Sequence, residues 1–146
     1  MSRVIYVVEG KTESVFIKQM IELDYIEPGK VFEVNLMQKR VKLTDNIMSK
    51  KVSMVNAIID TDVIEAVNLE NLSKNIKLLA SIGKVKLWVQ NDNFEEELCY
   101  MLGCSNIAAL GNLLRVKNPS LRWVKNYLAQ NIKYENYVTK EDFGKY

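Results

Sequence analysis

Three carboxylates in this sequence come directly after short apolar runs. Glu9 follows residues 4–8, and Asp60 and Asp62 follow residues 54–59. Both runs are rich in β-branched residues and are apolar at nearly every position, which is typical of strands buried on both faces of a parallel sheet. If the two strands are neighbours, the three acids meet at one edge and repel one another unless a cation lies among them. Ligation by oxygen alone suits Mg²⁺ or Mn²⁺, so we predict a metal site there.

The residues after Glu9 add a second feature to this edge. Gly10 removes a side chain where the chain turns from strand to helix, which leaves room for a phosphate near the helix N-terminus. We therefore predict that Gly10, Lys11 and Thr12 bind phosphate, and that Thr12 caps the helix. Glu13 has two interpretations, a further metal ligand or an acid that interacts favourably with the helix dipole, and both remain open.

Composition excludes several kinds of site. The chain has 146 residues and no histidine, so triads and dyads that need histidine and histidine-ligated zinc or haem are excluded. Cys99 and Cys104 lie five apart in an apolar stretch, which predicts buried thiols in a reducing compartment. No apolar run approaches the ~20 residues of a membrane span, and the N-terminus lacks a cleavage site, so we expect a cytoplasmic protein without membrane contact. The net charge of +2 does not by itself indicate a nucleic-acid partner.

The order of apolar patterns predicts an α/β fold. Strands are expected at 4–8, 31–37, 54–59 and 85–89, with helices at about 12–24, 68–82, 93–102, 107–114 and 119–130. Strands separated by segments of helical length imply right-handed crossovers and a mostly parallel four-stranded sheet flanked by helices. We predict one domain over 1–146, with a core at about 3–103, a helical C-terminal extension at about 104–146, and a loose end at 134–146.

These features together resemble the Toprim family. An apolar strand followed by Glu-Gly and a helix, and a later apolar strand followed by Asp-x-Asp, is that family's pattern, here Val7-Val8-Glu9-Gly10-Lys11-Thr12-Glu13 and Ile58-Ile59-Asp60-Thr61-Asp62. The Glu-Gly-x-Thr-Glu form, with Asn93-Phe94-Glu95-Glu96-Glu97-Leu98 at a later helix start, looks most like the stand-alone branch of OLD and RloB-like nucleases. The resemblance covers roughly residues 4 to 100.

The resemblance implies roles for these acids. Glu9 would be a general acid/base or a metal ligand, and Asp60 and Asp62 would hold Mg²⁺, so the three are the expected catalytic residues. The implied activity is Mg²⁺-dependent (or Mn²⁺-dependent) hydrolysis of RNA or DNA, in an effector of bacterial anti-phage defence. The alternative is a non-catalytic Toprim subunit that binds metal and phosphate beside an ATPase or nuclease partner. A homo-oligomer also remains open.

Several other residues could contribute to binding or catalysis, but each of them also has a purely structural interpretation. Glu95 and Glu96 could approach the acids from the fourth strand, but a solvated first helical turn is the favoured interpretation. Basic residues gather at 39–51, including Lys39 and Arg40, and again in the C-terminal third, including Arg122 and Lys125, where they could contact nucleic-acid phosphates. Such charges usually form a solvated surface. Trp123 and Tyr127 could stack on bases, although their spacing also suits the core of a helix, and Trp88 is expected in the core.

Overall fold

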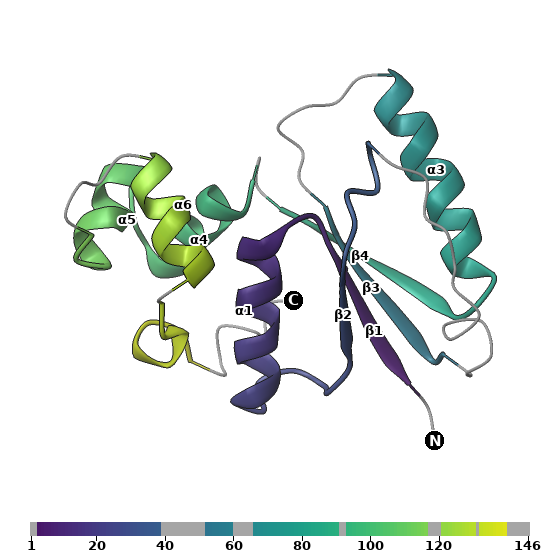
Figure 1. The fold of residues 1–146 in the computed structure, drawn as a ribbon, viewed down its shortest axis with the longest axis horizontal. Helices are drawn as coiled ribbons and strands as arrows, with labels where there is room; N and C mark the ends of the chain where they lie inside the picture. Colours follow the sequence, from purple (N-terminus) through teal and green to yellow (C-terminus); the bar gives the residue numbers. More distant parts are fainter. Residues whose placement is uncertain are drawn as a thin grey trace.

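The computed structural model describes residues 3–38, 52–59, 66–90, 93–116, 121–130 and 132–139. These residues form an α/β fold in which a parallel sheet is flanked by helices (Figure 1). In chain order the elements are β1 (Val4–Val8), α1 (Lys11–Glu22), β2 (Lys30–Glu33), β3 (Met54–Ile59), α3 (Ala66–Ala80), β4 (Lys84–Val89), α4 (Phe94–Leu102), α5 (Ile107–Leu113), α6 (Leu121–Gln130) and the 3₁₀ helix η1 (Tyr134–Asn136).

The sheet has the order β2-β1-β3-β4, and each neighbouring pair is parallel. The predicted parallel sheet is therefore confirmed. Strand β1 lies between β2 and β3, with Val7 opposite Phe32 on one side and Ala57 on the other. The chain thus leaves β1 toward one side of the sheet for β2 and returns to the other side for β3. In open parallel sheets, ligands bind beyond the carboxyl ends of the strands at such a reversal.

Helices cover both faces of the sheet (Figure 1). Side chains of β1 alternate between the two faces, which is why the whole strand is buried. Val4, Tyr6 and Val8 join a core with α1 and the C-terminal helices. Ile5 and Val7 join a second core with β3 and with Leu72 and Leu79 of α3. The continuously apolar pattern of β1 follows from this double burial.

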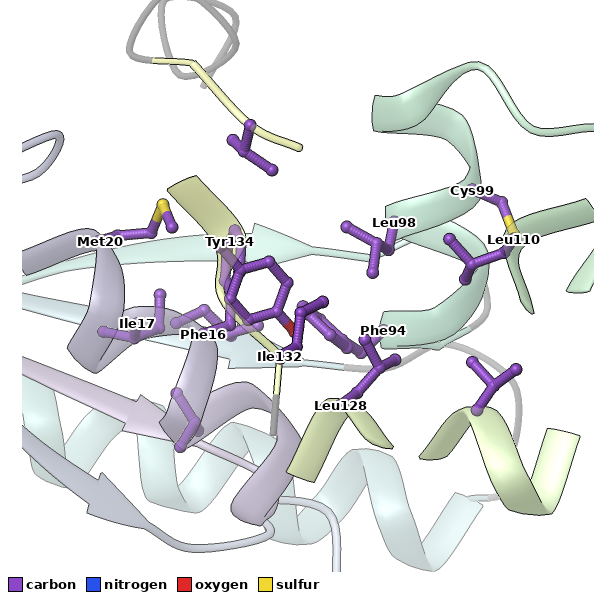
Figure 2. Close-up of a cluster of buried hydrophobic side chains, with 14 of the residues drawn as sticks. Phe16, Ile17, Met20, Phe94, Leu98, Cys99, Leu110, Leu128, Ile132 and Tyr134 are labelled. Atoms are coloured by element: carbon purple, nitrogen blue, oxygen red, sulfur yellow. The ribbon is translucent and has the colours of Figure 1, made fainter. Parts of the chain in front are cut away.

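The C-terminal segment packs against α1 (Figure 2). The Gln19 side chain fastens it, because Nε2 donates to the Ile132 carbonyl at 2.7 Å and Oε1 accepts from the Tyr134 backbone N–H at 2.9 Å. The Tyr134 ring is fully buried and meets Phe16 edge-on, with centroids 4.8 Å apart. The expectation of a loose end is therefore wrong for 134–139, and 140–146 lie outside the described residues.

Several element ends differ from the sequence predictions. Strand β2 ends at Glu33 because the chain turns at Asn35, whose side-chain Oδ1 accepts the Met37 backbone N–H. The predicted cap Thr12 is wrong, since this residue lies inside α1. Gly10 occupies the N-cap position of α1, and its carbonyl accepts the Ser14 backbone N–H.

The later helices agree more closely with the predictions. Asn93 caps α4 by accepting the Glu96 backbone N–H, and the start of the helix expected at 119–130 lies outside the described residues. Within the described ranges no helix is both long and apolar enough to cross a membrane.

Candidate active site

The candidate site lies at the carboxyl edge, by which we mean the edge of the sheet where β1, β2, β3 and β4 end at Val8, Glu33, Ile59 and Val89. Glu9 is the first residue beyond β1. Its Oε1 accepts a hydrogen bond of 2.9 Å from the Asn35 side-chain amide, which comes from the turn after β2. This bond holds the Glu9 carboxylate at the edge, beside the strand ends. Sequence reasoning missed Asn35 because its partner lies 26 residues away.

The turn that carries Asn35 is held in place by hydrogen bonds from helix α3. Two asparagines of α3 donate to its backbone: Asn71 to the Met37 carbonyl at 3.1 Å, and Asn75 to the Leu36 carbonyl at 2.7 Å. Asn75 is buried, so its hydrogen bond forms away from competing water. Helix α3 therefore fixes the turn, and the turn positions the amide that binds Glu9.

Glu13 is the second acid at this edge, in the first turn of α1. Its side chain is only 8% exposed. Burial is the main cause that raises the pKa of Glu13 to about 7; the charges of Glu9 and Glu95 act in the same direction, and a hydrogen bond from its own backbone N–H and the charge of Lys125 act against it. Glu13 thus lies close to Glu9, Glu95 and Lys125, and its place in the first turn of α1 also suits the helix dipole, so both interpretations remain open.

Glu95 brings a third carboxylate to the same region. We expected it in a solvated first turn of α4, and this expectation is wrong, because Glu95 is 4% exposed. Asn93 is the N-cap of α4, so Glu95 lies in the first turn, where the helix dipole favours an acid. Glu96, its neighbour, is partly exposed. Residues 95–97 are all glutamates, so the sequence alone did not show which of them would be buried.

The phosphate-binding prediction concerns Gly10, Lys11 and Thr12. Gly10 has an extended backbone, and a Cβ there would lie 3.5 Å from Glu13 Oε2. The Glu13 carboxylate therefore stands beside the helix start where a phosphate was expected. Lys11 is exposed and Thr12 is half-buried. A phosphate at this place would lie beside the Glu13 side chain.

The structure describes only some of the remaining predicted site residues. Asp60, Asp62, Lys39 and Arg40 lie outside the described residues, as does the side chain of Arg122, while Lys125 is exposed on α6. Among the described residues no three acids or thiols are grouped closely enough to hold a metal. The sequence nevertheless continues from Ile59 directly to Asp60, and Ile59 ends the strand beside β1.

The acids at this edge carry the oxygen ligands that a hard divalent cation prefers, although those among the described residues are not grouped closely enough to hold one by themselves. Glu9, Glu13 and Glu95 are carboxylates, and Glu13 and Glu95 are largely withdrawn from water. Buried carboxylates that repel one another are stabilised by a cation, and Mg²⁺ and Mn²⁺ prefer oxygen ligands.

Cys99 and Cys104 are free cysteines in the helical region beyond this edge, so no disulfide joins them.

Comparisons with protein-family models, with curated proteins and with solved structures find no match to this chain.

Proposed function

We propose that this protein is a Toprim-like nuclease that hydrolyses phosphodiester bonds of RNA or DNA with Mg²⁺ or Mn²⁺. One observation carries the proposal. Strands β1 and β3 are parallel neighbours, so the segments that begin with Glu9 and with Asp60 leave the sheet at the same edge. The buried acids Glu13 and Glu95 add carboxylates to that edge from α1 and α4.

In this proposal the metal ligands are Glu9, Asp60 and Asp62, with Glu13 and Glu95 as further acids around them. A bound divalent cation would polarise the scissile phosphate and make a water more acidic. Among the acids of this edge, Glu13 has a pKa raised to about 7, which suits a group that accepts a proton near neutral pH.

The chain's own residues supply orientation and charge. Asn35 fixes the Glu9 carboxylate through the hydrogen bond at 2.9 Å, and the α3 asparagines hold the Asn35 turn in place. Lys125 of α6 lies near enough to Glu13 to lower its pKa, and its exposed ammonium group can contact a phosphate of the substrate. Lys39, Arg40 and Arg122 would extend this basic surface.

The experiment is a cleavage assay with purified protein, labelled RNA and DNA, and Mg²⁺, Mn²⁺ or a chelator. We expect cleavage only with metal, and loss of cleavage in Glu9→Gln, Asp60→Asn and Asp62→Asn. Two matched control variants are available on the exposed end of α1 and just beyond it, Glu22→Gln and Asp24→Asn. Both controls should cleave like the unchanged protein.

Calorimetric titration with Mg²⁺ and Mn²⁺ separates this proposal from its alternative. Metal binding that depends on Glu9, without turnover of any nucleic acid, would refute the nuclease and favour the metal-binding subunit beside an ATPase or nuclease. Absence of both binding and cleavage would refute the metal site itself. In a phage-challenged bacterial host, the nuclease proposal expects protection that Glu9→Gln abolishes.

A further inference from the structure

A cavity of about 440 Å³ lies on the α1 face of the sheet, bounded by β3, β4, α1 and α4. Its floor is formed by side chains of three neighbouring strands, including Tyr6 of β1, Ile58 of β3 and Trp88 of β4. Its size is that of small-molecule sites in proteins. Trp88 was expected in the core; it is partly buried, packs against the core and lines this cavity.

The cavity wall combines aromatic rings with acids. Rings come from the sheet, from both helices and from the segment after α1: Tyr6, Phe16, Tyr25, Trp88 and Phe94. The Trp88 ring is held in place, because its Nε1 donates to Asn56 Oδ1 at 2.9 Å. Glu97 of α4, 9% exposed, adds a carboxylate to the wall. A flat ligand with N–H donors on one edge matches these groups.

The position of Lys86 decides which flat ligand fits. Its Nζ lies 4.2 Å from the centroid of the Trp88 ring, so the ring already has a cation beside it. An organic cation stacked on Trp88 would meet that like charge. A neutral aromatic ring would not, and nucleobases are neutral rings that stack on aromatic side chains and are recognised by hydrogen bonds along their edges.

We propose that this cavity binds one unstacked nucleobase, with guanine preferred. Guanine presents two adjacent N–H groups, on N1 and N2, which a carboxylate such as that of Glu97 accepts together. The cavity reaches Glu13, which also lies beside Gly10 and close to Glu9 at the carboxyl edge. A base in the cavity would therefore place its own phosphate near that edge.

This inference rests on the proposed function for the choice of ligand, but its test does not need cleavage. Guanosine, adenosine, cytidine and uridine are added separately to the intact protein in EDTA, and binding is followed by ligand-observed NMR. Nucleosides carry no phosphate, and the chelator removes the metal, so only the base and sugar are tested. We expect saturable binding, with guanosine at least tenfold tighter than uridine.

A matched pair of variants locates the site. Met54→Trp places a large ring in the cavity, whereas Leu69→Trp adds the same ring on exposed α3. We expect Met54→Trp to weaken guanosine binding at least tenfold and Leu69→Trp to leave it unchanged. If Met54→Trp does not fold, Glu97→Gln tests the site in its place, and this substitution should remove the preference for guanosine.

Other results would overturn the inference. The first is that no nucleoside binds saturably, and the second is that Met54→Trp and Leu69→Trp bind guanosine equally well. The third is that a phenylalkylammonium ion binds more tightly than guanosine. The two proposals fail separately. Cleavage without nucleoside binding refutes the base pocket alone, and nucleoside binding without cleavage refutes the nuclease alone.

Discussion

Asn35 donates its side-chain amide to Glu9 Oε1 across 2.9 Å, and this bond joins the turn after β2 to the first residue beyond β1. A carboxylate at a metal site is oriented by groups around it as well as by the ion. In the proposed metal site, Asn35 would therefore be a positioning residue for Glu9. It also shapes its own turn, because its Oδ1 accepts the Met37 backbone N–H at 3.1 Å.

Replacing Asn35 with alanine should lower metal-dependent cleavage by about tenfold or more, the usual effect of removing a partner that orients a metal ligand. The apparent metal affinity should fall with it, because the freed carboxylate must be ordered again on binding. Initial rates measured across a Mg²⁺ titration check both effects. Asn71→Ala is the matched control, since it removes a hydrogen bond from the same turn without touching Glu9. Equal losses in the two variants would show that only the turn matters.

Much of the sheet could be predicted from the sequence, because its strands carry a local pattern. The apolar run of β1 reflects burial on two faces, and the strand at Met54–Ile59 was predicted at its observed bounds. Parallel pairing followed from the segments of helical length between strands. The end of β2 could not be predicted in this way, because it depends on one asparagine side chain closing a turn.

The site was predictable only in part. The position of Glu9 at the carboxyl edge could be predicted from its place after a strand, whereas Asn35 binds it from a distant segment. Glu95, Glu96 and Glu97 have the same side chain, and successive residues of a helix point about 100° apart. Which of them is buried depends on how α4 packs, so burial of Glu95 and Glu97 could not be known from composition.

Glu13 should make the stability of the metal-free protein depend on pH. Its pKa is raised from 4.5 to about 7 in the folded protein, chiefly by burial. Below about pH 4.5 the carboxyl is protonated in both states and its contribution is fully present. As pH rises toward 7 the unfolded state loses the proton first, so stability falls, by an amount on the order of 3 kcal/mol.

Urea unfolding at several pH values in EDTA measures this effect. Glu13→Gln cannot titrate, so its stability should change less between about pH 5 and pH 8 than that of the unchanged protein. Glu22→Gln, at the exposed end of α1, should keep the original dependence. Parallel pH profiles for the unchanged protein and Glu13→Gln would contradict the assignment.

Cys99 should react slowly with alkylating reagents. Burial, followed by the charge of Glu96, raises the pKa of Cys99 to about 11, and burial also raises the pKa of Cys104. At pH 8 a thiol of pKa 11 is a thiolate in about one molecule in a thousand, and the thiolate is the reactive form. Mass spectrometry after iodoacetamide treatment of Cys104→Ser should show little modification until denaturant is added. Modification of the folded variant at the rate of a free cysteine would disprove this.

Tyr134 is a core residue whose hydroxyl group lies near two acids of the carboxyl edge. Its hydroxyl is buried, has no hydrogen-bond partner among the described residues, and lies close enough to Glu13 and Glu95 for their charges to raise its pKa, after the larger effect of burial. A buried hydroxyl without a partner destabilises the folded state, so Tyr134→Phe should stabilise the protein by about 1 kcal/mol. The ring itself contributes packing against Phe16, and Tyr134→Leu should therefore destabilise it. Thermal unfolding of the two variants separates hydroxyl from ring. If Tyr134→Phe is instead clearly destabilised, the hydroxyl must donate to one of the two carboxylates and thereby help to hold the acids of the carboxyl edge together.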